Sequence, residues 1–236
     1  MRAISLWSGP RNVSTALMYS FAQREDCEVI DEPLYAHYLS KVDVHHPGEE
    51  EVLATMNHDG REIIDQLLIP GDRPLRFIKK MAHHWINLDD GLLKKFSNIF
   101  LIRDPKEMLP SLINQIPNPV LRDTALKSQW DLYSKLANSG AEVAIIDSAQ
   151  LLMNPKAILG KVCKTLKIPF DDKMLTWAKG SIPEDGVWAK YWYHNVHKST
   201  GFQPYRKKDD LFPDHLSILL DECEPYYKLL FNHSIK

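Results

Sequence analysis

A loop near the start of the chain carries residue types that can hold an anion. It follows the apolar run 3–7 and precedes a stretch of helical period, and its residues are Ser8, Gly9, Pro10, Arg11, Asn12, Val13, Ser14 and Thr15. Between a strand and a helix, backbone N–H groups and the helix dipole point at whatever binds there. Arg11 adds a guanidinium fork suited to phosphate or sulfate, and Ser14 and Thr15 add hydroxyl donors. The loop therefore predicts a site for a doubly charged anion.

This loop differs from the phosphate loop of ATP- and GTP-dependent enzymes. The pattern G-x-x-x-x-G-K-S/T can start at Gly9, but it then requires Gly and Lys where Ser14 and Thr15 stand. Without that lysine and the Mg²⁺-binding hydroxyl after it, phosphoryl transfer loses two charge-neutralising groups. A P-loop small-molecule kinase therefore stays an alternative, as does a catalytically silent nucleotide-binding or scaffold protein of the same fold.

A second segment places an arginine and a serine eight residues apart. Arg103 ends the apolar run 99–103, Pro105 stands early in the next predicted helix, where proline is tolerated, and Ser111 lies about two turns further on. Pro110 removes a backbone donor inside that helix, so we expect a kink near Ser111. The alternative is a buried strand that simply ends at Asp-Pro, with Arg103 in a surface ion pair.

Both segments resemble motifs of the sulfotransferase family. Residues 10–17 are similar to its 5′-phosphosulfate loop, with Arg11, Ser14 and Thr15 in matching places and Val13 where the family has glycine. Arg103 and Ser111 match its 3′-phosphate motif. The resemblance covers roughly residues 3–177. It implies that the chain uses 3′-phosphoadenosine 5′-phosphosulfate (PAPS) as co-substrate and transfers its sulfuryl group to a hydroxyl or amine of a small-molecule or carbohydrate acceptor.

Such a transfer needs a base for the acceptor proton and positive charge at the leaving phosphate oxygen. Arg11 is placed for the second task. Glu32 resembles the catalytic glutamate of family members that act on sugars and tyrosine, and His83 lies just beyond the place where cytosolic small-molecule members carry Lys-Thr-His. Asp31 is a third candidate. We take Glu32 as the base, on the expectation that its strand lies beside the first strand.

Two further features supply charge near this edge. Lys79 and Lys80 point to opposite faces of their strand, so we expect Lys79 to snorkel or to neutralise an anion and Lys80 to be exposed. Residues 180–208 lack a clear period and mix aromatic and cationic side chains, which predicts a loop that covers adenine and phosphates. Its candidate co-substrate residues are Lys198, Ser199, Thr200, Gly201 and Arg206. His194 and His197 lack a third ligand, so no metal is expected.

The elements that must position these groups follow from alternating patterns. Five apolar runs rich in β-branched and aromatic residues predict a parallel sheet covered on both faces: 3–7, 27–31, 75–79, 99–103 and 143–147. Helical periods occupy 13–23, 49–68, 106–115, 121–137, 155–166 and 214–230, with Asn12 in the N-cap position of the first. The alternation predicts a three-layer α/β domain spanning residues 1–236, and the resemblance implies a P-loop NTPase-like sulfotransferase fold.

Composition excludes several other classes. With 29 Lys plus Arg against 31 Asp plus Glu, the net charge of −2 favours neither nucleic acid nor an anionic membrane. Three cysteines without metal spacing indicate a reduced protein, and no run reaches the ~20 apolar residues of a membrane helix. We expect a cytoplasmic protein. The sequence leaves the particular acceptor and the oligomeric state open.

Overall fold

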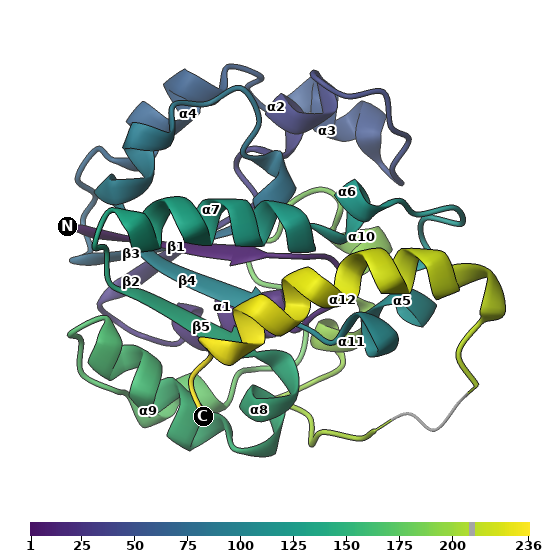
Figure 1. The fold of residues 1–236 in the computed structure, drawn as a ribbon. Coiled ribbons are helices and arrows are strands. Elements are labelled where there is room, and N and C mark those ends of the chain that lie inside the picture. Colours follow the sequence, from purple (N-terminus) through teal and green to yellow (C-terminus); the bar gives the residue numbers. More distant parts are fainter. Residues whose placement is uncertain (208–210) are drawn as a thin grey trace.

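The computed structural model describes residues 1–207 and 211–236, which form one parallel sheet between layers of helices (Figure 1). The strand order is β2-β3-β1-β4-β5. The strands are β1 (Arg2–Ser8), β2 (Cys27–Asp31), β3 (Leu75–Met81), β4 (Ser97–Ile102) and β5 (Val143–Asp147). All five predicted strands are confirmed, with ends shifted by at most two residues. The three-layer α/β prediction is confirmed as well.

The position of the second strand differs from the expectation. Leu75 in β3 pairs with Arg2 in β1 and also with Cys27 in β2, so β3 lies between them. The expectation that residues 27–31 lie directly beside residues 3–7 is therefore wrong. The chain leaves β2, runs through three helices and returns to place β3 against β1. Glu32 therefore lies at the end of a strand that is two places away from β1 and its following loop, rather than one.

Helices cover both faces of the sheet. Figure 1 shows α1, α8 and α9 on one face and α4, α7 and α12 on the other. The α-helices are α1 (Ser14–Ala22), α2 (Tyr35–Leu39), α3 (Glu49–Thr55), α4 (Gly60–Leu67), α5 (Pro105–Leu112), α6 (Leu121–Thr124), α7 (Leu126–Asn138), α8 (Ser148–Met153), α9 (Pro155–Thr165), α10 (Ala189–Trp192), α11 (His194–His197) and α12 (Ser217–Asn232). Short 3₁₀ turns lie at Ala82–His84, Asp90–Lys95, Asp172–Leu175 and Asp214–Leu216.

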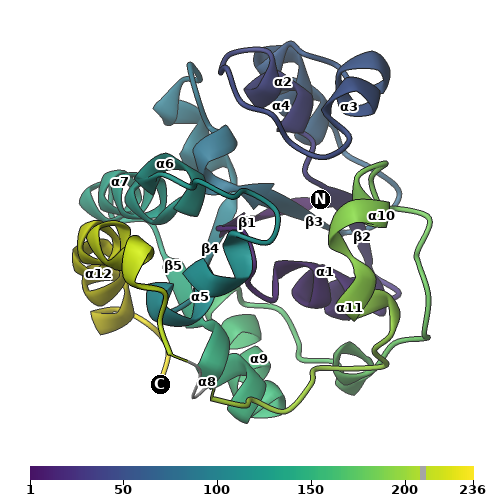
Figure 2. The ribbon, with the colours of Figure 1, turned by 90° about the vertical axis from the view of Figure 1, so that its right-hand side faces the viewer.

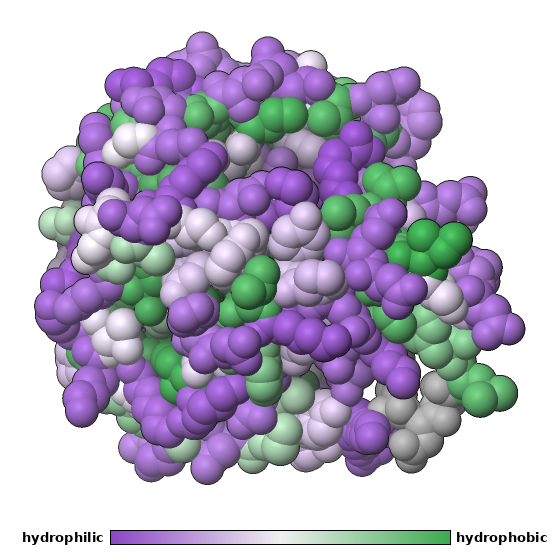
Figure 3. All heavy atoms as spheres, in the orientation of Figure 1, coloured by the Kyte–Doolittle hydropathy of each residue, from purple (hydrophilic) through white to green (hydrophobic). Residues whose placement is uncertain are grey.

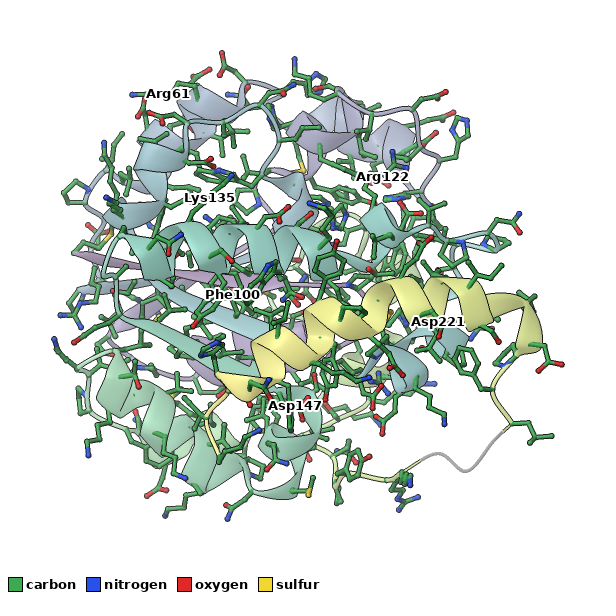
Figure 4. All side chains as sticks on the ribbon, in the orientation of Figure 1. Arg61, Phe100, Arg122, Lys135, Asp147 and Asp221 are labelled. Carbon is green, nitrogen blue, oxygen red and sulfur yellow. The ribbon has the colours of Figure 1, made fainter. Side chains whose placement is uncertain are left out.

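Strand residues alternate between the two cores. In β4, Ile99 and Leu101 pack into the cluster on the α1 side, whereas Phe100 and Ile102 pack into the cluster beneath α7 and α12. Figure 4 labels Phe100 on the sheet behind these two helices. Because both faces are covered, every side chain from Ile99 to Ile102 is buried, as the continuous apolar run predicts.

Several helices differ from the periodic patterns. Residues 49–68 form two helices, because Asp59 caps a new one by accepting hydrogen bonds from the N–H groups of Arg61 and Glu62. Residues 121–137 are divided at Ala125, whose φ of 62° is left-handed. The short helices α2 and α8 were not predicted. The predicted loop 180–208 contains α10 and α11, and its last residue lies outside the described part of the chain.

The face of the molecule drawn in Figure 3 is mainly polar. Figure 3 shows hydrophilic residues over most of one face, with hydrophobic residues scattered between them. Within the two described stretches of chain, no helix combines the length and apolar character needed to cross a lipid bilayer.

Candidate functional site

A cavity of about 550 Å³ opens at the carboxyl ends of the strands. Figure 2 looks onto this edge, with α5 and α6 on one side and α10 and α11 on the other. The residues predicted from the sequence that line it are Pro10, Arg11, Asn12, Val13, Ser14, Thr15, Glu32, Lys79, His83, Arg103, Ser111, Lys198, Ser199 and Gly201. Residues from five segments of the chain, up to 191 positions apart, therefore meet at the edge predicted for the anion.

The loop after β1 is held in a fixed shape. A Cβ on Gly9 would lie 2.7 Å from the Thr124 carbonyl oxygen, so only glycine fits where α6 packs against the loop. Gly9 itself is not part of the cavity lining. Asn12 binds β4 through a 3.1 Å hydrogen bond to the Leu101 carbonyl oxygen, and its own amide oxygen accepts the Ser14 N–H at 3.0 Å. The side chain of Asn12 therefore satisfies the first N–H of α1, although Val13 holds the N-cap position.

Val13 does not strain this loop. Its φ of −92° is open to any residue, so a glycine is not required there. The left-handed residue is Arg11, with a φ of 53°. For a residue with a side chain this conformation costs roughly 1 kcal/mol or more, and such positions are concentrated at functional sites.

The two predicted anion-binding motifs meet at Arg11. Its Nε donates a 3.0 Å hydrogen bond to Ser111 Oγ, and Arg103 Nη1 donates a 2.5 Å hydrogen bond to the Arg11 carbonyl oxygen. Burial lowers the pKa of both guanidinium groups, and the charge of Arg103 lowers the pKa of Arg11 further. Glu107 faces Arg103 at 3.7 Å, and Pro110 lies inside α5 without removing Ser111 from the cavity. Two partly buried cations of like charge at one place would be stabilised by an anion.

Glu32 projects into the same cavity from the end of β2. Its φ of 39° is left-handed, and its N–H donates a 2.8 Å hydrogen bond to the Lys79 carbonyl oxygen, which holds this turn. The carboxylate accepts a hydrogen bond from Lys79 Nζ. Burial raises the pKa of Glu32, the Asp31 charge raises it further, and the Lys79 ammonium opposes the shift. The net rise makes Glu32 more basic than an ordinary glutamate.

His83 also lines the cavity, but in a different electrostatic state. Burial lowers its pKa to about 3, and the charges of His46 and Arg122 add to that effect. Its Nδ1 has no hydrogen-bond partner within residues 1–207 and 211–236, and its ring lies edge-on to Tyr38 at 4.8 Å. A neutral imidazole with a low pKa can hydrogen-bond an acceptor group, but it holds a proton only weakly.

The third base candidate, Asp31, is not part of the cavity lining. Its two oxygens accept hydrogen bonds from Lys79, Tyr193 and the Gly186 N–H. The geometry therefore favours Glu32 over Asp31 as the base.

The two lysines of β3 lie on opposite faces, as predicted, but one is placed differently from the expectation. Lys79 points into the cavity and binds the carboxylates at its edge. Lys80 is fully buried, and its Nζ lies 4.2 Å from the ring centroids of both Trp7 and Phe96. The expectation that Lys80 is exposed is wrong, because the rings of Trp7, Trp85 and Phe96 enclose its ammonium group. Burial holds the pKa of Lys80 well below its usual value.

The segment 180–207 forms one wall of the cavity. Trp188, Trp192, Tyr193 and Lys198 line it, while Arg206 does not. Ser199 lines it too, but its Oγ already donates to the Val196 carbonyl oxygen at 2.8 Å and accepts from Trp177 Nε1 at 3.2 Å. Thr200 lies outside the lining, and its carbonyl oxygen accepts a 3.2 Å hydrogen bond from the backbone N–H of Trp177, next to the antiparallel bridge between Thr176 and Gly201.

Several lining residues carried no signal in the sequence. Tyr35 is on α2, which follows Glu32, and its OH lies 2.9 Å from His46 Nδ1. Asp123 is on α6, nearly ninety residues further along the chain. Only the fold brings these groups together. Within the described ranges, no group of three or more His, Cys, Asp or Glu residues is arranged to hold a metal ion.

The five-stranded parallel sheet of order β2-β3-β1-β4-β5, with helices on both faces and a short loop leading from β1 into α1, has a P-loop NTPase-like fold. Within this fold class, a family model described as a sulfotransferase domain matches residues 1–232. The chain therefore belongs to the sulfotransferase domain family, as the two sequence motifs predicted.

Comparison with solved structures shows the same fold at low sequence identity. The sulfotransferase domain of the olefin synthase from Synechococcus PCC 7002 aligns with a TM-score of 0.58 and 14% identity, over 100% of this chain and 96% of that chain. A sulfotransferase from Alicyclobacillus acidocaldarius aligns with a TM-score of 0.56 and 10% identity, over 100% of this chain and 98% of that chain.

Two curated relatives from Arabidopsis thaliana are more similar in sequence. "Branched-chain-amino-acid aminotransferase-like protein 2" is 40% identical over 235 residues, and protein 1 of the same name is 38% identical over 232 residues. The matches cover 99% and 98% of this chain but 42% of each relative. The chain thus spans less than half the length of these relatives.

Proposed function

We propose that the chain transfers the sulfuryl group of PAPS to a hydroxyl or amine of a small-molecule or carbohydrate acceptor. One observation carries the proposal: Arg11, Arg103 and Ser111 converge at a cavity that Glu32 also lines. The cations suit a donor with two separate anionic groups, and the carboxylate suits removal of a proton from the acceptor. Membership of the sulfotransferase family supports this assignment.

On the donor side, the loop residues Arg11, Ser14 and Thr15 hold the 5′-phosphosulfate, and Arg103 and Ser111 hold the 3′-phosphate. The Arg11 guanidinium stabilises the negative charge that develops on the leaving phosphate oxygen. Lys198 and the aromatic rings of the segment 180–207 exclude water around the transferred group.

On the acceptor side, Glu32 accepts the proton of the attacking hydroxyl or amine. A new bond forms between the acceptor atom and sulfur, while the bond from sulfur to the bridging oxygen breaks. Its electron pair stays on the 5′-phosphate of the product 3′,5′-bisphosphate. The acceptor itself would lie against the wall of Tyr35, Trp188 and Trp192, with the His83 side chain lining the same space.

Calorimetric titration tests the donor assignment. We expect the 3′,5′-bisphosphate to bind more tightly than adenosine 5′-monophosphate or ATP, because two charge-assisted contacts to a 3′-phosphate contribute about 2–4 kcal/mol. Arg103→Ala should remove this preference. Arg61→Ala is the matched control, since Arg61 lies on α4 (Figure 4) and pairs with Asp65 on the surface.

Equal affinities for the three nucleotides would contradict the donor assignment. Tight binding of ATP that depends on Mg²⁺ would favour the kinase alternative. Bisphosphate binding without turnover across a panel of phenols, amines and sugars would favour a catalytically silent protein.

A further inference from the structure

The Lys79 ammonium is shared by three oxygen groups at the edge of the cavity. Its Nζ lies 2.9 Å from Asp31 Oδ1 and 2.6 Å from the Tyr193 hydroxyl, and it also donates to Glu32 Oε1. All four side chains are buried. This network joins the carboxyl ends of β2 and β3 to the segment 180–207.

That segment holds Asp31 in place. Asp31 Oδ2 accepts a 2.7 Å hydrogen bond from the Tyr193 hydroxyl and a 3.2 Å hydrogen bond from the Gly186 N–H. The Tyr193 oxygen also accepts a 2.9 Å hydrogen bond from Trp188 Nε1. Gly186 is required here, because a Cβ on it would lie 2.2 Å from the Trp188 ring. The orientation of Asp31 is therefore set by residues about 160 positions away.

The charges of this network do not balance. Two carboxylates face one ammonium, so the cluster carries a net charge of −1 when all three groups are ionised. Two tyrosine hydroxyls face Glu32 within the described residues: Tyr193 from the segment 180–207 and Tyr35 from α2. Burial, together with the charge of Glu32, raises the pKa of each hydroxyl, so both stay neutral. A carboxylate fully neutralised by one ammonium would be a weak base. Since Asp31 competes for Lys79, Glu32 keeps unbalanced negative charge.

We propose that Asp31 is a positioning residue which competes with Glu32 for the Lys79 ammonium and thereby keeps Glu32 basic enough to take the acceptor proton. The inference rests on the proposed function, in which Glu32 is the base. Asp31 touches no reacting atom and acts through Lys79. Tyr193 and Gly186 connect Asp31 to the segment 180–207, so this segment contributes to proton transfer as well as to the wall of the cavity.

Two variants test this proposal, because they should shift the acid limb of the kcat/KM profile in opposite directions: Asp31→Asn and Lys79→Met. Asparagine keeps the shape of Asp31 but removes its charge, so Lys79 is left to Glu32 alone. The acid limb of the kcat/KM profile should then move to lower pH by about one unit or more. Lys79→Met removes the cation that opposes protonation, so the limb should move to higher pH. A merely structural role would not produce shifts in opposite directions.

The matched control is Asp147→Asn. Asp147 is also a buried aspartate at the end of a strand, and it accepts a 3.1 Å hydrogen bond from the Tyr227 hydroxyl. It lies at the end of β5 beneath α12 (Figure 4) and does not line the cavity. Asparagine also caps helices well, so α8 should persist. We expect this variant to leave the acid limb where it is.

A second readout separates this inference from the proposed function. Carbon NMR of glutamate labelled at the side-chain carboxyl follows the ionisation of Glu32 without any substrate. An unshifted Glu32 titration in a folded Asp31→Asn protein overturns the inference, and this variant decides the question even where Lys79→Met fails to fold. If Asp31→Asn loses turnover without moving the limb, Asp31 itself is the base and the inference fails.

If Glu32 titrates as expected in both variants while Glu32→Gln keeps full turnover, the base assignment of the proposed function fails. The charge competition would then stand as a property of the free protein, but Asp31 would not be a positioning residue of the reaction. The two failures therefore give different results.

Discussion

Arg11→Ala isolates the role of the guanidinium in the loop after β1. The change removes the 3.0 Å hydrogen bond to Ser111 and one of the two cations that meet at the cavity. On the proposed function, Arg11 acts mainly where charge develops on the leaving oxygen. A transition-state contact of this kind contributes roughly 10²–10³ in rate, or about 3–4 kcal/mol.

Other properties should change much less. The contact of Arg11 with the bound ground state corresponds to about 1 kcal/mol, so affinity for the 3′,5′-bisphosphate should fall about fivefold to tenfold. Stability should change little. The left-handed φ of 53° strains alanine and arginine alike, and the variant loses a repulsion with Arg103. The thermal midpoint should therefore stay near that of the parent protein.

The assay pairs steady-state sulfuryl transfer with calorimetric titration of the bisphosphate, and Arg61→Ala serves as the control. A turnover number that stays at the parent value while affinity drops a hundredfold would refute the reasoning. Arg11 would then be a binding residue only.

Three further predictions follow from the same geometry. Glu32→Gln should lower the rate of single-turnover sulfuryl transfer about 10²–10⁴-fold, with bisphosphate binding near normal. His83→Asn should mainly raise the acceptor KM, because the imidazole pKa of about 3 makes His83 a poor proton acceptor. The reverse pattern would give His83 the role of base. Lys80→Met should raise the free energy of unfolding at neutral pH. Burial lowers the pKa of Lys80, so at neutral pH the unfolded chain binds a proton that the folded protein does not. The resulting loss of folding stability decreases as pH rises toward about 10.4, the ordinary pKa of lysine. Urea unfolding at pH 7 and pH 10, with exposed Lys135→Met as control (Figure 4), checks this, and a loss of stability at pH 7 would mean that the aromatic rings hold Lys80 as a cation. Gly9→Ala should destabilise the fold by about 1–3 kcal/mol, because its Cβ would meet the Thr124 carbonyl at 2.7 Å; an unchanged unfolding midpoint would show that α6 gives way.

The sequence by itself determined the five strands and the two motifs that we propose to bind the donor. A strand covered on both faces must be apolar along its length, so the five strands were readable from short windows. Arg11 lies in the loop after β1 and Ser14 and Thr15 begin α1, while Arg103 and Ser111 lie on one strand-to-helix unit. Because the residues of each motif are close in sequence, they remain close in the folded protein. Their spacing therefore predicts that they contact the same anion.

Local sequence patterns did not predict where a helix ends when its end is set by packing against another element or by a capping side chain. The helical period across residues 121–137 continues through Ala125, yet α6 ends there and its Thr124 carbonyl packs over Gly9. Capping by Asp59 likewise divides residues 49–68. Periodicity reports which face is buried, but it does not report where a chain must turn to meet another element.

Only the tertiary structure decided which strands are neighbours and which polar groups share a charge. The insertion of β3 between β1 and β2 places Lys79 beside Asp31 and Glu32, and α10 and the residues around it bring Tyr193 to the same point. The tertiary structure also encloses Lys80 among Trp7, Trp85 and Phe96, although its position near the end of a strand had predicted an exposed side chain. Burial and the distances between charges set the proton affinities of such groups, and both arise from residues far apart in the chain.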